Sequence, residues 1–232
     1  MRKHKPVPRS RWHASQKHLL NRWKRKGLKL ERAKIELTLL PLLLQQSKKY
    51  PENAAILEIG CGPVCVSQFL PHKHKTFLDP MIDDFRRMFP GELPEEGEYI
   101  ASTAERIHKE SNSYDLVICL NTLSFSLNPE LVVNEIERLL TSDGTFILEI
   151  RTHSQTEARL HYWAMRLLPQ LSKGMAPYCY SLRGIRRTLE RHFTVEKEQL
   201  LGKKFSWLPF IKRDKRLFIC RALHKRTNQV IS

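Results

Sequence analysis

The sequence predicts a doubly wound α/β fold, in which helices cover both faces of a mostly parallel sheet. From residue 54 onward, short apolar runs typical of strands alternate with segments of helical pattern. The runs that read as strands are "AAILEI", "KTFLD", "EYIAS", "YDLVICL" and "TFILEI". Strands separated by helices pair in parallel through right-handed crossovers, and this connection places helices on both sides of the sheet.

The segments between these strands predict the helices. We expect helices at "VCVSQFL", "MIDDFRRMF", a short "AERIHKE", and "NPELVVNEIERLL", where Asn128 and Pro129 suit the N-cap and N1 positions. After the fifth strand, a helical stretch over about 154–170 precedes "SLRGIRRTLERHF". The runs "FTVEKEQLL" and "RLFICRAL" then predict a closing antiparallel pair.

The first 50 residues predict a basic tail and a helical N-terminal cap, and residues 51–232 the main domain. The segment "MRKHKPVPRSR" is charged and carries two prolines, so we expect it to be disordered. From His18 to Leu44, leucines and other apolar residues recur at helical spacing. Gly27 and Pro41 interrupt the pattern, which predicts one or two amphipathic helices.

The charge is distributed unevenly along the chain. The net charge is +16. Residues 1–34 contain thirteen Lys or Arg and one Asp or Glu, and residues 35–150 contain nine Lys or Arg and eighteen Asp or Glu. Residues 151–232 contain eighteen Lys or Arg and five Asp or Glu. Basic flanks favour an anionic partner, which could be nucleic acid, a phosphorylated metabolite or a lipid surface. The alternative is a basic tail that serves only solubility.

The cysteines and the hydropathy predict a cytoplasmic protein. The five cysteines are odd in number and lie in apolar segments, which favours free thiols over a disulfide framework. The most apolar run, "LTLLPLLL", is far shorter than a membrane span needs and contains Pro41, so we expect no transmembrane segment.

The stretch "AILEIGCGPVCVSQFL" carries the strongest functional signal. Gly60 and Gly62 follow the first strand, at the crevice where doubly wound folds bind their ligands. Asp79 ends the second strand, near the offset at which an acid binds ribose hydroxyls, although it could equally cap the next helix. Pro63 has no N–H for a pyrophosphate, which argues against a dinucleotide. These residues predict a ribose-containing cofactor.

The motifs "ILEIGCGP", "FLDPM", "STAERI", "YDLVICLNTLSF" and "NPELVVNEIERLLTSDGTFILEI" occur in this order over residues 54–150. Together they resemble the class I S-adenosylmethionine-dependent methyltransferases, in particular the methyltransferase type 11 group. The resemblance implies a Rossmann-like, mostly parallel seven-stranded sheet whose last strand is antiparallel. It also implies S-adenosyl-L-methionine as the cofactor, and a helical lid insertion over about 152–180.

The resemblance implies a role for each residue of these motifs. The methionine and ribose parts of the cofactor would lie against Glu58, Gly60, Cys61 and Gly62, and the ribose hydroxyls would bind Asp79. The adenine would lie beside Pro80 and Met81, and its edge would face Thr103, Ala104 and Glu105. The methionine part would also face Cys119, Leu120 and Asn121. The chain departs from the family pattern at three places. Thr103 stands where the family usually has an acid, and Val64 stands where a third glycine is frequent. Ser124 and Phe125 stand where a pair of histidines is common. The last departure suggests a different substrate pocket.

Two other groups of residues could carry chemistry. Four residues could serve as zinc ligands: Cys61, Cys65, His72 and His74. Because Cys61 lies in the predicted loop, Cys65 in the predicted helix and the two histidines in an exposed turn, we expect no metal site. For a catalytic base the best candidate is His153, just past the fifth strand, although an exposed or capping imidazole is the simpler interpretation.

The tryptophans are a third feature. Trp12 and Trp23 lie among basic residues, as in single-stranded nucleic-acid binders, yet packing explains them as well. The same alternatives apply to Trp163 and Trp207.

The sequence therefore predicts a methyltransferase that uses S-adenosyl-L-methionine and acts on a small or medium-sized acceptor, with the N-terminal helices and the 152–190 region as its lid. One alternative is an RNA methyltransferase that uses the basic flanks to hold its substrate. Another is a nucleic-acid-binding protein that keeps the fold without catalysis.

Overall fold

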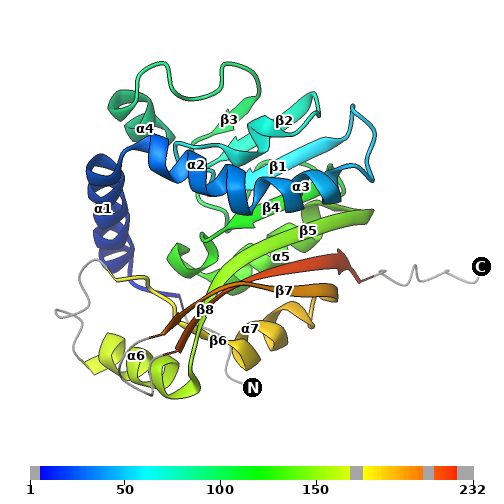
Figure 1. The fold of residues 1–232 in the computed structure, drawn as a ribbon. Coiled ribbons are helices and arrows are strands. Elements are labelled where there is room, and N and C mark those ends of the chain that lie inside the picture. The colour runs from blue at the N-terminus through cyan, green and yellow to red at the C-terminus, as the bar shows by residue number, and fades with distance from the viewer. Residues whose placement is uncertain (1–5, 168–174, 206–211, 224–232) are drawn as a thin grey trace, which may run out of the picture.

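A single sheet organises the chain in the computed structural model, which describes residues 6–167, 175–205 and 212–223 (Figure 1). Its main strand order is β3-β2-β1-β4-β5-β8-β7, and β6 pairs with β5 beside this path. The strands are β1 (Ala55–Ile59), β2 (His74–Leu78), β3 (Glu98–Ile100), β4 (Tyr114–Leu120), β5 (Leu140–His153), β6 (Tyr180–Ser181), β7 (Phe193–Phe205) and β8 (Lys212–Ala222).

The strand directions confirm the predicted fold class. Strands β1 to β5 are mutually parallel, and β8 runs antiparallel to both of its neighbours, β5 and β7. The described residues contain eight strands and not seven, because the two-residue β6 pairs with the end of β5. The winding reverses between β1 and β4, and this switch point is where a doubly wound sheet opens a ligand crevice.

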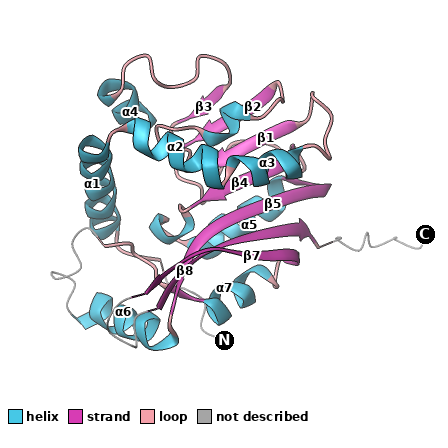
Figure 2. Cartoon of the chain, viewed as in Figure 1, coloured by secondary structure: helices cyan, strands magenta, loops and turns pink. Residues whose placement is uncertain are grey.

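Helices cover both faces of the sheet, as Figure 2 shows. The α-helices are α1 (Arg9–Lys26), α2 (Leu28–Thr38), α3 (Leu40–Ser47), α4 (Ile82–Met88), α5 (Pro129–Leu139), α6 (Gln155–Leu167) and α7 (Leu182–Leu189). Two short 3-10 helices are η1 (Val66–Phe69) and η2 (Leu123–Phe125). No helix in the described ranges is long and apolar enough to cross a bilayer.

The period of two along the central strands divides the core into two layers. Leu57 of β1 and Val117 of β4 pack with α5 and α7, whereas Ile56 and Ile118 of the same strands pack with α2 and α3. Successive side chains of a strand point to opposite faces, so a strand covered on both sides is apolar throughout. The N-terminal helices therefore share a core with the sheet.

Two helices predicted from local pattern are absent. Residues 64–70 form only the 3-10 turn η1, because Cys65 before it is left-handed, with φ 48°. The segment "AERIHKE" forms turns, since the α5 side chains take its backbone polar groups: the Ile107 N–H donates to Glu135, and Arg138 donates to the Ile107 and Lys109 carbonyls.

The N-terminal region is more helical than predicted. It contains three helices, because Pro41 lies in the first turn of α3, where a proline is compatible with a helix, and so begins that helix. The predicted disordered segment extends too far: α1 begins at Arg9, and the Val7 N–H donates to the Leu127 carbonyl. Residues 1–5 lie outside the described residues, as do residues 168–170 of the helix expected after the fifth strand.

The N-cap predicted at Asn128 is present, and we expect it to contribute to stability. Its side-chain oxygen accepts the Glu130 N–H at 3.2 Å. An Asn128→Ala substitution should lower the free energy of unfolding by about 1 kcal/mol, because a helix N–H loses its partner. Urea unfolding measures this change. Asn128→Asp should retain most of the stability, and equal losses in both variants would contradict a capping role.

Candidate active site

One pocket opens at the carboxyl ends of β1, β2, β4 and β5, and encloses a cavity of about 280 Å³. The strand ends and their loops form its floor, and α1 with α2 lies across it (Figure 1). Twelve of the thirteen predicted cofactor-binding residues line it: Glu58, Gly60, Cys61, Gly62, Asp79, Pro80, Met81, Thr103, Ala104, Glu105, Leu120 and Asn121. The exception is Cys119, which is fully buried in the core.

The glycine loop requires glycine at two positions. Gly60 and Gly62 both have positive φ, 68° and 56°, which disfavours other residues. A Cβ on Gly60 would lie 2.1 Å from Cγ2 of Thr122. A Cβ on Gly62 would lie 3.5 Å from the Trp23 ring of α1. Gly60 therefore has no room for a side chain, whereas at Gly62 the constraint is the left-handed backbone.

The Glu58 carboxylate holds the far side of this loop. It is buried, and it accepts the N–H groups of Val66 at 3.0 Å and Ser67 at 2.7 Å, together with the Ser67 hydroxyl at 2.7 Å. Burial raises the pKa of Glu58 to about 7, although these donors oppose the shift. Glu58 thus combines a place in the pocket wall with a structural role that the sequence did not reveal.

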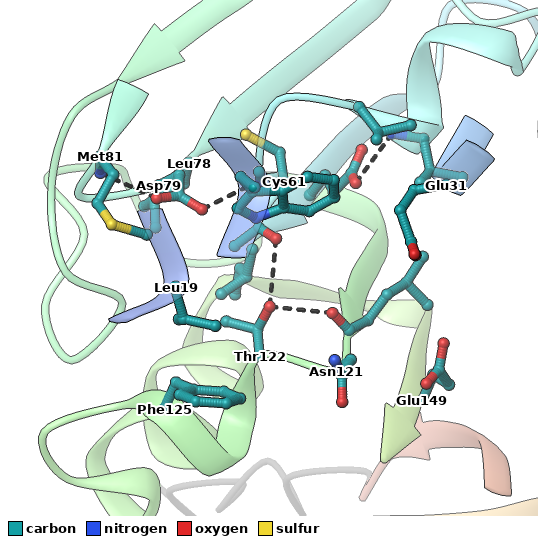
Figure 3. A pocket seen from close by; sticks show the side chains of 18 of the residues that line it. Leu19, Glu31, Cys61, Leu78, Asp79, Met81, Asn121, Thr122, Phe125 and Glu149 are labelled. Atoms are coloured by element: carbon teal, nitrogen blue, oxygen red, sulfur yellow. Dashed lines mark hydrogen bonds between the residues drawn. The ribbon is translucent and has the colours of Figure 1, made fainter. Parts of the chain in front are cut away.

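The Asp79 carboxylate holds the near side of the loop. One oxygen accepts the Gly62 N–H at 3.1 Å, and the other accepts the Met81 N–H at 2.9 Å (Figure 3). Burial raises the pKa of Asp79 to about 6. Met81, and not Asp79, occupies the N-cap position of α4. Asp79 therefore connects the glycine loop to the start of α4, within the pocket.

Apolar side chains surround Asp79. Leu19, Met81 and Phe85 form one cluster, and Phe125 packs against it. Glu105, predicted to face an adenine edge, uses one oxygen to accept the Leu127 and Asn128 N–H groups at 2.6 and 2.9 Å. This half of the pocket therefore presents the buried carboxylates of Glu58 and Asp79 beside apolar walls.

The opposite half of the pocket is strongly charged, and the sequence reasoning missed it. Figure 3 shows Glu149 across the pocket from Asp79, with Asn121 and Thr122 between them. Glu149 at the end of β5 pairs with Lys215 of β8, Oε2 to Nζ at 3.0 Å, and burial raises the pKa of Glu149. The signal was the single acid in the apolar strand "TFILEI".

The structure does not bring His153 into the pocket. His153 ends β5 beyond the lining residues, and its Nδ1 lies 3.1 Å from a Glu157 oxygen. Burial is the main cause that lowers its pKa. The described part of the 152–190 region contributes no lining residue, and among the described residues the helices that lie over this pocket are α1 and α2.

Two tryptophans of α1 line the pocket. The indole of Trp12 donates to the Phe125 carbonyl at 2.9 Å, and the Gln16 amide donates to the same oxygen at 3.1 Å. Trp23 contacts the glycine loop. Packing against the pocket thus accounts for Trp12 and Trp23, whereas Trp163 on α6 is half exposed and Trp207 lies outside the described residues.

The cysteine and histidine residues considered as zinc ligands do not converge. Cys61 and Cys65 are buried with Phe77, and His72 is buried in the turn before β2. Within the ranges that the structure describes, no group of three or more potential ligands could hold a metal ion.

Comparison with known proteins identifies the central part of the chain. Residues 57–148 match the family described as "Methyltransferase domain", which confirms the resemblance seen in the sequence. Residues 57–148 therefore carry the pattern of a methyltransferase domain. No protein in the curated set matches the sequence.

Solved structures share the fold of the methyltransferase domain at low sequence identity. A protein from Pyrococcus horikoshii OT3 has 17% identity and a TM-score of 0.59, covering 85% of this chain and 93% of its own. A putative methyltransferase from Bacillus halodurans C-125 has 15% identity and a TM-score of 0.58, covering 78% and 97%.

A third structure is a geranyl diphosphate C-methyltransferase from Streptomyces coelicolor A3(2), in complex with Mg²⁺, geranyl-S-thiolodiphosphate and S-adenosyl-L-homocysteine. It has 9% identity and a TM-score of 0.61, covering 79% of this chain and 75% of its own. At such identities the likeness concerns the fold.

The family match divides the pocket of the methyltransferase domain in two. The residues around Asp79 and the glycine loop fall inside the matched range, whereas Arg22, Glu149, Arg151 and Lys215 fall outside it. The charged half of the pocket is therefore built from parts of the chain that the family pattern does not describe.

The collision at Gly60 makes a specific prediction. A Gly60→Ala substitution should lower the free energy of unfolding by about 2–5 kcal/mol and abolish ligand binding in the pocket, because left-handed strain adds to the clash with Thr122. Thermal unfolding measures the first effect, and calorimetric titration with S-adenosyl-L-homocysteine the second.

Gly91→Ala is the matched control, since Gly91 has φ 71° but no atom within 4 Å of the position that a Cβ would take. It should cost only about 1–2 kcal/mol for the backbone conformation. Equal effects of the two substitutions would show that the loop does not need close approach at Gly60.

Proposed function

We propose that this chain is an S-adenosyl-L-methionine-dependent methyltransferase acting on a small or medium-sized acceptor in the pocket beneath α1. The observation that carries the proposal is a single cavity that joins two different halves. One half contains the family's glycine loop and Asp79, and the other contains charged groups on the ends of β5 and β8. A cofactor and an acceptor need such adjoining sites to react in line.

The residues of the first half fit this cofactor. Asp79 offers carboxylate oxygens to ribose hydroxyls, and Leu19, Met81 and Phe85 offer apolar surface to an adenine ring. The glycine loop leaves room for close backbone approach, since a side chain at Gly60 would collide. The buried carboxylates of Glu58 and Asp79 favour a cationic ligand over a phosphate. S-adenosyl-L-methionine supplies an electrophilic methyl group on a sulfonium centre.

The protein contributes mainly position and the exclusion of water. Trp12 and Gln16 anchor α1 to η2 through the Phe125 carbonyl, so this helix covers the pocket. The Asn121 N–H donates to the Glu149 carbonyl at 2.8 Å, which fixes the turn between the two halves. A covered, preorganised pocket raises the effective concentration of the reacting groups and removes competing water.

A small acceptor fits this cover better than a polymer does. Part of the basic N-terminal segment faces inward, since Arg22 and Lys26 of α1 line the pocket. The transfer of labelled methyl groups into a cell extract, fractionated into RNA, protein, lipid and small molecules, tests the proposal. We expect label in the small-molecule fraction. Label confined to RNA would support an RNA methyltransferase instead.

Asp79 gives the cofactor site a predicted pH dependence. With a pKa of about 6, Asp79 is ionised at pH 7.5 and mostly protonated at pH 5. Protonation removes a hydrogen-bond acceptor, so affinity for S-adenosyl-L-homocysteine should fall by about tenfold between these values. Asp79→Asn should weaken binding by about 10- to 100-fold and flatten this dependence. Calorimetric titration measures both.

The control is Asp83→Asn on α4, where the carboxyl is exposed and pairs only with Arg86 among the described residues. This variant should bind the ligand like the wild type. Undiminished affinity in Asp79→Asn would show that Asp79 serves only to hold the loop.

If the acceptor atom must lose a proton, we propose Glu149 as the group that accepts it. Glu149 lies in the pocket with a raised pKa, whereas His153 lies outside it. Glu149→Gln should lower kcat by about 100-fold while S-adenosyl-L-homocysteine still binds, and His153→Ala should change kcat by less than about twofold. Steady-state kinetics over pH 5–9 decides between them, because the opposite pattern would assign the base to His153.

A further inference from the structure

We propose that the charged half of the pocket is an anion subsite, in which Arg22 of α1 and Arg151 of β5 bind a carboxylate or phosphate group of the acceptor. This inference rests on the proposed function, since it assigns the substrate class of the same pocket. It follows from a contrast among the charged side chains of the pocket. Within the described residues, the acids have hydrogen-bond or ion-pair partners, whereas these two arginines have none.

The acids of the pocket are already engaged. Glu58, Asp79 and Glu105 accept backbone N–H groups. Glu31 of α2 accepts from Lys26 at 2.9 Å and Lys34 at 3.3 Å, and Glu149 pairs with Lys215 at 3.0 Å. Each pocket carboxylate therefore has its own donors.

Two arginines differ from these paired groups. Arg22 and Arg151 line the same pocket, and neither makes an ion pair or a side-chain hydrogen bond with any residue that the structure describes. Burial is the main cause that lowers the pKa of Arg22; the negative charge of Glu31 opposes this shift, and the positive charge of Arg151 adds to it. Arg22 is half-buried and Arg151 is exposed, and two like charges that repel each other in one pocket are stabilised by an anion between them.

The chemistry of the two groups defines the ligand. A guanidinium presents N–H donors in a fork that matches carboxylate and phosphate oxygens. Arg22 comes from the helix that covers the pocket and Arg151 from the strand that forms its floor. An anionic group bound to both would connect the cover of the pocket to its floor.

The arrangement also separates the charges of the two ligands. The buried carboxylates Glu58 and Asp79 lie on the cofactor side, and Arg22 and Arg151 on the acceptor side. A cationic cofactor and an anionic acceptor would each meet complementary charge, and each would be disfavoured in the other half.

The test is kinetic, on the small-molecule acceptor found by label transfer. The labelled product should be retained by an anion-exchange resin, and phosphatase treatment then distinguishes a phosphate monoester, which loses retention, from a carboxylate, which keeps it. Arg22→Gln and Arg151→Gln should each raise KM for this acceptor by about tenfold or more, with the affinity for S-adenosyl-L-homocysteine within about twofold of wild type.

Matched controls carry the same loss of charge outside the pocket. Arg25→Gln on α1 and Arg159→Gln on α6 replace exposed arginines, and KM should stay within about twofold of wild type. A product that the resin does not retain would overturn the inference. Equal changes of KM in the pocket variants and in the controls would also overturn it, because the change would then follow from the net charge of the protein.

A direct binding measurement separates this inference from the proposed function. Succinate and inorganic phosphate, titrated at constant ionic strength, should change the fluorescence of Trp12 and Trp23, which line the pocket. The change should saturate in the wild type and in both controls, and weaken by about tenfold in Arg22→Gln and Arg151→Gln. No saturable change would overturn the anion subsite, whereas absent binding of S-adenosyl-L-homocysteine would overturn the proposed function.

Discussion

Two buried carboxylates hold the loop on which the pocket depends. Glu58 and Asp79 together accept the N–H groups of Gly62, Val66, Ser67 and Met81, and so fix the loop between β1, β2 and η1. A loop with left-handed glycines cannot satisfy these groups through a helix or a strand, and unpaired buried N–H groups are costly. The raised pKa values of both acids reflect the cost of burying them, which the hydrogen bonds offset.

The pocket is assembled from two sources. The side that we propose for the cofactor is built mainly from strand ends and loops within residues 57–148, the range that matches the methyltransferase family. The other side comes from the N-terminal helices, from the end of β5 and from β8. Such a division allows one fold to keep its cofactor chemistry while the remaining segments determine the acceptor, and the family match alone therefore leaves the acceptor open.

The two missing helices show where local pattern lost to tertiary contacts. The segment after the glycine loop has helical spacing, but Glu58 takes the N–H groups of Val66 and Ser67, and the left-handed Cys65 ends any helical turn before them. At residues 104–110, side chains of α5 take the backbone bonds that a helix would have used. In both cases a charged side chain from outside the segment binds its backbone, and the weak local helix propensity is overridden.

The sequence by itself predicted the parallel sheet and the Asn128 cap, because strand periodicity and capping depend on neighbouring residues. Its motifs also pointed to twelve residues that the structure places around one pocket. Only the tertiary structure decided that Arg22, Glu149, Arg151 and Lys215 meet in one pocket, and that His153 does not. These side chains lie on α1, β5 and β8, whose proximity follows from sheet order and helix packing, and no local spacing encodes that proximity.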